Sequence, residues 1–225
     1  MRKSIVFIPG LLSDERVWQH QMAHLREVAS LTAIRFQGEN HPQAMVEAIL
    51  KQSPPRFTLV GHSMGGWLAL EVMRYAPQQV DALCLINTTA RPDSKEKAAR
   101  RKQWIQMAQE GQFSKIAAEL ARAMVLHTNP SVENMFSSQG PKRFIDDEQS
   151  MLQRKETFSI LPTIQAPTLV IHATQDRVFT LEEHQELTQK IPHAQLALVE
   201  DSGHMSPMEQ PVAVTALLRY WFTYR

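Results

Sequence analysis

The sequence has little cysteine and no long apolar run. Cys84 is the one cysteine in 225 residues, so the chain cannot form an internal disulfide bond, and a metal site rich in cysteine is excluded. A single cysteine fits a reducing compartment, and we expect a cytoplasmic protein. No stretch approaches the roughly 20 apolar residues of a membrane span, so we expect no membrane partner. Pro9 and Gly10 interrupt the apolar N-terminal run, which favours a strand entering a turn over a signal peptide.

An excess of charge of either sign is also missing. Lys and Arg number 24 against 23 Asp and Glu, a formal net charge of +1. Such a balance offers no field to hold a polyanion, so we expect no nucleic-acid partner. Hydrophobic residues make up 43% and charged residues 21%, which excludes a disordered or coiled-coil chain. The length suits one domain over residues 1–225.

Short apolar runs alternate with amphipathic helical patterns along most of the chain. Six runs have the length and composition of buried strands, at residues 4–8, 31–36, 57–60, 80–87, 167–173 and 195–199. The alternation predicts an α/β fold, with a mostly parallel sheet of about six strands and helices on both faces.

Residues 91–165 break this rhythm and contain no convincing strand. We expect three helices there, with residues 129–144 forming a loop or a short helical turn. The segment follows the fourth strand, at the carboxyl side of the sheet, where the ligand crevice of an open α/β sheet lies. It is therefore predicted to be a helical lid insertion.

One motif carries a chemical prediction. Residues 61–65 (GHSMG) match G-x-S-x-G, and they follow a buried strand and begin a helix. A serine on such a sharp turn projects out of the sheet, and Gly61 and Gly65 leave room for the strand and the helix to pass closely. The helix also directs its positive dipole end toward Ser63. We expect Ser63 to be a nucleophile.

A serine hydroxyl needs a base and a group that orients the base. Asp176 follows the fifth strand and His204 follows the sixth, so all three side chains come just after strand ends. The order Ser63, Asp176, His204 is the one expected for this architecture. An oxyanion hole would use the amide of Met64 and an amide from the loop after the first strand, where Leu11 is the best candidate, with Leu12 as its neighbour.

On these motifs the chain resembles the α/β-hydrolase superfamily over nearly its whole length. It looks most like the small serine-type members, similar to carboxylesterases, that hydrolyse esters, thioesters or carbon–carbon bonds of modest-sized substrates. Two features depart from the pattern. Pro9-Gly10 stands where the superfamily usually has His-Gly, and most members carry two further strands before the first one here. A sheet without them should leave an exposed edge near residues 31–36, which favours self-association as a homodimer.

Three other ionisable residues lie near these motifs. His62 is adjacent to the nucleophile on a tight turn, so we expect it to pack or hydrogen-bond beside the site. His172 lies on a buried strand and is expected to be a core histidine. Asp201 is the rival of Asp176 as the orienting acid, but in this architecture that carboxylate comes from the loop after a different strand.

Five basic residues gather in the first helix of the insertion. They could bind an acidic substrate or the phosphates of coenzyme A, but basic runs are common on exposed helices, so a solvated helix face is expected. The residues are Lys95, Lys97, Arg100, Arg101 and Lys102.

Some methionines and acidic residues near the expected site also have structural interpretations. Met64, Met205 and Met208 flank the expected triad, and they either line an adaptable acyl pocket or fill the core. Asp146 and Asp147 in the insertion are expected to be solvated or to cap a helix.

The function predicted from the sequence is hydrolysis of small carboxylic esters through an acyl-Ser63 intermediate. His204 acts as the base and Asp176 holds its ring, while the amides of Met64 and Leu11 bind the oxyanion. No metal or organic cofactor is required. One alternative is a carbon–carbon hydrolase or lyase that acts on an anionic dicarbonyl-type substrate. Another is a ligand-binding protein with a nearly silent triad.

Overall fold

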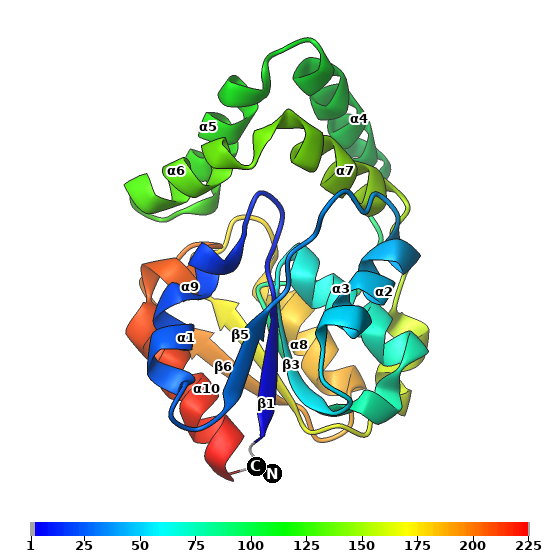
Figure 1. Ribbon diagram of the computed structural model, residues 1–225, viewed down its shortest axis with the longest axis vertical. Helices are drawn as coiled ribbons and strands as arrows, with labels where there is room; N and C mark the ends of the chain where they lie inside the picture. The colour runs from blue at the N-terminus through cyan, green and yellow to red at the C-terminus, as the bar shows by residue number, and fades with distance from the viewer. Residues whose placement is uncertain (1–2, 225) are drawn as a thin grey trace.

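The computed structural model describes residues 3–224, which form a parallel sheet surrounded by helices (Figure 1). The sheet has six strands in the order β2-β1-β3-β4-β5-β6, and every neighbouring pair is parallel. The predicted α/β fold is confirmed. The strands are β1 (Ser4–Ile8), β2 (Ser30–Ala33), β3 (Phe57–His62), β4 (Val80–Ile86), β5 (Thr168–Ala173) and β6 (Gln195–Val199).

Apolar side chains of the strands point to both faces of the sheet. In β1, Ile5 and Phe7 pack into one core cluster, whereas Val6 and Ile8 pack into the other, as the two-residue repeat of a strand requires. Helices α1 (Gln19–Leu25) and α10 (Pro211–Tyr224) cover the first face. The second face is covered by α2 (Pro42–Gln52), α3 (Met64–Tyr75) and α8 (Leu181–Lys190). Short helices link the elements: η1 (Glu15–Trp18), η2 (Pro77–Gln79), η3 (Phe158–Thr163) and α9 (Ser206–Glu209).

Four helices, not three, form the insertion between β4 and β5. They are α4 (Lys95–Gln109), α5 (Phe113–Met124), α6 (Pro130–Ser138) and α7 (Gly140–Leu152). The expectation of a loop or a short helical turn over residues 129–144 is wrong, because α6 and the start of α7 cover most of this segment. The Asn129 side chain caps α6 by accepting from two backbone amides, and Pro130 begins the helix. In Figure 1 the insertion stands over the carboxyl end of the sheet.

Acidic residues of α7 are buried, contrary to expectation. Asp147 is fully buried and Asp146 is 8% exposed. Each pairs with a basic residue one turn earlier, Lys142 Nζ with Asp146 at 2.7 Å and Arg143 Nε with Asp147 at 2.9 Å. The pair with Arg143 offsets only part of the cost of burying Asp147, because burial still raises the pKa of its carboxyl to about 7.

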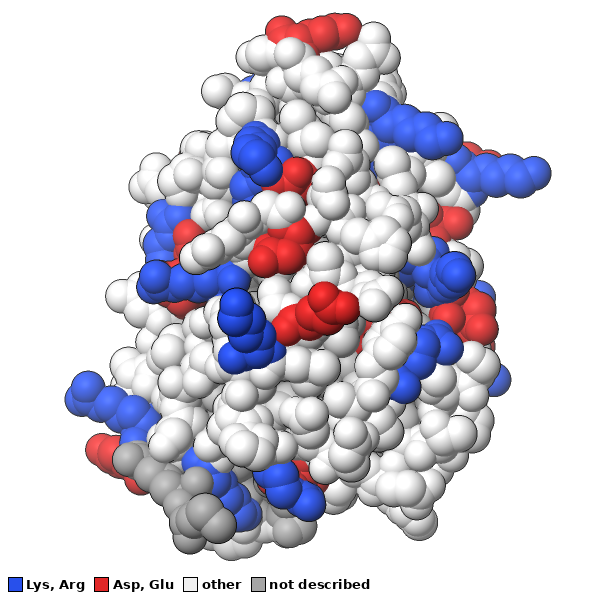
Figure 2. Space-filling view, turned by 45° about the vertical axis from the view of Figure 1, so that its right-hand side comes forward, with Lys and Arg blue, Asp and Glu red and all other residues white. Residues whose placement is uncertain are grey.

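Among residues 3–224, β2 forms one edge of the sheet and β6 the other, and no further strand pairs with the free side of β2. Self-association through this edge stays a prediction. Among the helices of the described chain, none is long and apolar enough to cross a membrane. Basic and acidic side chains are interspersed on the face that Figure 2 presents, in keeping with a net charge near zero.

Candidate active site

The Ser63 turn joins β3 to α3 with a strained backbone. Ser63 has φ 54° and ψ −119°, a combination that costs an ordinary L-residue roughly 1–3 kcal/mol. The turn is held by hydrogen bonds from Ser63 N to Ile86 O (3.0 Å) and from Thr88 Oγ1 to Ser63 O (2.7 Å). A Cβ on Gly61 would lie 2.2 Å from the carbonyl oxygen of Gly65, so no larger residue fits at position 61.

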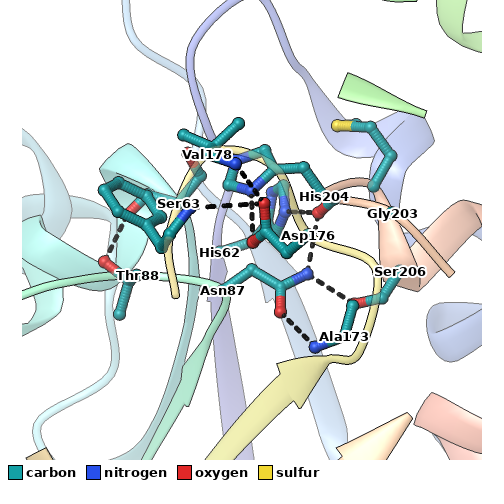
Figure 3. A network of polar contacts seen from close by, with 12 residues as sticks. His62, Ser63, Asn87, Thr88, Ala173, Asp176, Val178, Gly203, His204 and Ser206 are labelled. Atoms are coloured by element: carbon teal, nitrogen blue, oxygen red, sulfur yellow. Dashed lines mark hydrogen bonds and ion pairs between the residues drawn. The ribbon is translucent and has the colours of Figure 1, made fainter. Parts of the chain in front are cut away.

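Three side chains from separate loops form one hydrogen-bonded chain (Figure 3). His204 Nε2 lies 2.8 Å from Ser63 Oγ, and His204 Nδ1 lies 2.9 Å from Asp176 Oδ2. The His204 and Asp176 side chains are 1% and 0% exposed. The structure therefore brings together the serine, the acid and the histidine selected from the sequence, and the neutral histidine with its proton on Nδ1 suits both contacts.

The surroundings of Asp176 favour its ionised form. Burial acts to raise the pKa of its carboxyl, but the charge and hydrogen bond of His204 and the amides of Val178 and Phe179 outweigh burial and lower it. The two amides donate to Oδ1 at 2.7 and 3.4 Å. Its rival Asp201 is exposed, and the structure does not bring the Asp201 side chain to His204.

The loop that carries His204 is fixed through its own carbonyl group. His62 Nε2 and Asn87 Nδ2 each lie 2.8 Å from His204 O, and Ala173 N donates to Asn87 Oδ1 at 2.9 Å. Burial, followed by the proximity of His204, lowers the pKa of His62 to about 3, so His62 is a neutral donor. Sequence reasoning missed Asn87, whose signal is a polar residue at the end of a buried strand.

The oxyanion candidates flank Ser63. A Cβ on Gly10 would lie 3.1 Å from Ser63 Cβ, so the loop after β1 approaches Ser63 closely. Leu11, but not its neighbour Leu12, lines the cavity that contains Ser63. Met64 begins α3 directly after Ser63. Within residues 3–224, neither the Leu11 nor the Met64 amide donates a hydrogen bond to another protein group.

A cavity of about 390 Å³ lies over Ser63, between the carboxyl end of the sheet and the insertion. Its apolar lining includes Leu11, Trp104, Leu120, Ala123, Met124, Met151, Val178 and Phe179. Its charged lining consists of Asp93, Lys97, Arg100, Arg101, Glu119, Arg154 and Arg177. A larger groove of about 660 Å³ runs past Trp67 and Glu71 but reaches none of the three hydrogen-bonded residues.

The basic helix face was predicted to be solvated, and the structure corrects this in part. Lys95 and Lys102 are exposed, as expected, and do not line the cavity. Lys97 and Arg100 are exposed but line the cavity. Arg101 is 12% exposed, pairing with Asp93 and Glu148 at 2.5 and 2.6 Å. Spacings of three and four residues place the cavity-lining side chains of α4 on one face of the helix: Lys97, Arg100, Arg101 and Trp104.

The flanking methionines belong to the core, which settles one of the open alternatives. Met64 and Met205 are each 1% exposed, and Met208 packs against the core. The methionines of the cavity are instead Met124 and Met151. His172 is buried, and its ring centroid lies 4.4 Å from that of His184. Cys84 is buried, which raises the pKa of its thiol and leaves it unreactive.

Fold and site together define a class of protein. Residues 5–217 match the model of the alpha/beta hydrolase family, so the chain belongs to that family. It is similar to an esterase from Thermogutta terrifontis described with malate bound, with a TM-score of 0.91, 25% sequence identity, and coverage of 98% of this chain and 89% of that one.

The chain is also similar to two lactonases. The chain is 24% identical to 3-oxoadipate enol-lactonase 2 of Acinetobacter baylyi, over 94% of this chain and 85% of that protein. The structure of the enol-lactonase from Burkholderia xenovorans LB400 has a TM-score of 0.88 and 20% identity, covering 99% of this chain and 92% of that one. The relatives are hydrolases, and this chain is a hydrolase of the same family.

Proposed function

We propose that the protein is a serine hydrolase that cleaves small carboxylic esters. The observation that carries the proposal is the hydrogen-bonded chain from Ser63 Oγ through His204 to Asp176, at 2.8 and 2.9 Å. An esterase and two lactonases among its relatives support ester bonds as the target.

The first step is acylation. Ser63 Oγ attacks the ester carbonyl carbon while His204 Nε2 takes the hydroxyl proton. Asp176 stabilises the imidazolium that forms, and the amides of Met64 and Leu11 bind the oxyanion. The carbon–oxygen bond of the ester then breaks, and His204 returns the proton to the departing alcohol. Water repeats the sequence on the acyl-serine and releases the acid.

The insertion has a role in the same proposal. It closes over Ser63 and supplies an apolar wall from α5, where Leu120, Ala123 and Met124 recur at three and four residues. Such a wall suits an apolar acyl part, and it excludes water from the acyl-serine.

The second candidate is a carbon–carbon hydrolase or lyase that uses the same triad. The observation that favours it is the basic lining of the cavity, which suits an anionic dicarbonyl substrate.

A fluorophosphonate probe tests the nucleophile. Intact mass should show one adduct on the native chain and none on Ser63→Ala. The native protein should also hydrolyse short-chain aryl esters. Lack of an adduct on the native chain, or the same adduct on the alanine variant, would reject Ser63. An adduct without ester turnover would instead favour the second candidate.

A further inference from the structure

The cavity over Ser63 contains more positive charge than the protein itself neutralises. Asp93 Oδ2 pairs with Arg101 Nε and Asp93 Oδ1 with Arg154 Nη2, both at 2.5 Å, and Arg101 also pairs with Glu148. The charges of two carboxylates, Asp93 and Glu148, therefore neutralise those of two guanidinium groups, Arg101 and Arg154. The other charged residues of the lining are three cations, Lys97, Arg100 and Arg177, against one carboxylate, Glu119.

Those three cations have no ion-pair partner among the described residues. No carboxylate of residues 3–224 lies within 4.0 Å of the side-chain nitrogens of Lys97, Arg100 or Arg177. Arg154 adds a second observation, because its side chain is 2% exposed and its Nε has no hydrogen-bond partner there. A buried donor without a partner costs free energy unless a ligand or water meets it.

All three cations line the cavity that contains Ser63. Lys97 Nζ is 5.3 Å from the centroid of the Phe179 ring, and that ring is 5.6 Å from the centroid of the His204 ring. Arg177 directly follows Asp176 in the chain. An anionic group held by these side chains would therefore belong to the molecule whose ester bond meets Ser63.

We infer that the substrate is an ester whose acyl chain ends in a carboxylate, held by Lys97, Arg100 and Arg177 at the mouth of the cavity. This inference rests on the proposed function. The apolar wall of α5 accommodates the chain, and the guanidinium groups match the planar carboxylate with two parallel hydrogen bonds. At about 390 Å³ the cavity is near the small end for ligand sites, which favours a short carboxylate ester over a substrate as large as a coenzyme A thioester.

Two matched esters test the inference. One is the mono-4-nitrophenyl ester of adipic acid, whose chain is long enough to limit attack by its own carboxylate. The other is its neutral methyl ester, methyl 4-nitrophenyl adipate. Measured by the release of nitrophenol, kcat/KM for the anionic ester should be at least about 10-fold above that for the neutral one, since charge-assisted hydrogen bonds are stronger than neutral ones.

Variants then identify the binding side chains. Arg100→Gln and Arg177→Gln should each lower the anionic-to-neutral ratio of kcat/KM about 10-fold. Lys102→Gln, on the same helix but outside the cavity, should leave the ratio unchanged. Adipate should inhibit more strongly than inorganic phosphate. Equal inhibition by phosphate would overturn the assignment of a carboxylate.

The two proposals fail in different ways. Equal turnover of both esters, abolished by Ser63→Ala, would overturn the carboxylate site and leave the serine hydrolase standing. Turnover of neither ester would overturn the ester hydrolase, and a measurement of the melting temperature (Tm) then tests the carboxylate site by itself. Adipate should raise the Tm of the native protein and not that of the Arg100→Gln, Arg177→Gln double variant, whereas no rise in the native protein would overturn the site.

Discussion

The carboxyl edge of the sheet and the helical insertion face one cavity, but different interactions hold them in place. At the sheet edge, backbone groups at strand ends fix the site, as when Ser63 N bonds Ile86 O and two side chains hold the carbonyl of His204. In the insertion, ion pairs between side chains connect α4 to α7 and to the segments before and after them. We therefore expect substitutions at the sheet edge to change the chemistry, and substitutions in the insertion to change stability and substrate choice.

The largest expected effect tests the sheet edge. Asp176→Asn should lower kcat for an aryl ester about 10³- to 10⁴-fold, because an amide favours the wrong tautomer of His204 and does not stabilise its imidazolium. Steady-state kinetics measure the loss of kcat, and the free energy of unfolding should change little. Asp201→Asn is the matched control, since Asn tolerates the positive φ of 51° at that position. A greater loss in the control would assign the acid to Asp201.

The next effect tests the ion pairs of the insertion. Asp93→Asn leaves the charge of Arg154 buried with weaker compensation, which should lower the free energy of unfolding by about 3 kcal/mol. Denaturation with urea at pH 7 measures it. Asp81→Asn breaks an exposed pair with Arg56, with side chains 38% and 70% exposed, and should cost less than about 1 kcal/mol.

Acid should remove the contribution of Asp93. Burial acts to raise the pKa of the Asp93 carboxyl, but Arg101 and Arg154 outweigh burial and lower it below its unfolded value of about 3.9. The stabilisation is thus fully present above pH ~4 and is lost as the pH falls through the folded pKa. The difference between the native protein and Asp93→Asn should narrow from pH 7 to pH 3. A constant difference would show that the pair contributes through packing alone.

A third substitution could break the separation between the two regions. Glu209 accepts from Leu126 N, which follows α5 within the insertion (2.6 Å), and from Met205 N beside His204 (3.1 Å). Glu209→Gln directs an amide group at one of these donors, and we expect a loss of about 1–3 kcal/mol in stability and about 10-fold in kcat/KM. Exposed Glu200→Gln serves as control. If stability falls without any change in kcat/KM, the two hydrogen bonds of Glu209 do not position His204.

The smallest effect concerns a second contact between the regions. Asp14 caps the short helix η1 through the amide of Arg16 at 3.0 Å and accepts from Gln139 Nε2 at 2.8 Å. Asp14→Ala should lower stability by about 1 kcal/mol and Asp14→Asn by less, because Asn also caps helices. Thermal unfolding compares them, and equal losses would mean that the charge, not the cap, matters.

The six strands and the three hydrogen-bonded residues could be predicted because their signals are local. A buried strand is a short apolar run, and the G-x-S-x-G turn requires glycines around Ser63 whatever the rest of the fold contains. Asp176 and His204 followed from the rule that parallel strands end at one edge of the sheet. Their distances to each other required the structure.

The insertion was less predictable because its signals depend on distant partners. Residues 130–138 are polar enough to suggest a loop, and they become helical where Val132, Met135 and Phe136 are buried. Arg101 and Glu148 lie 47 residues apart in sequence, so no local pattern pairs them. The same holds for Asn87, whose partner is a carbonyl group 117 residues further along the chain.

The strained turn at Ser63 has a consequence for how this protein would respond to selection. Glycine adopts φ 54° without the penalty of a side chain, so Ser63→Gly relieves strain in the folded state. The same change removes the hydroxyl group that we propose as the nucleophile. A library screened only for heat resistance would therefore enrich inactive chains at this position, and only a screen that also requires turnover would retain the serine.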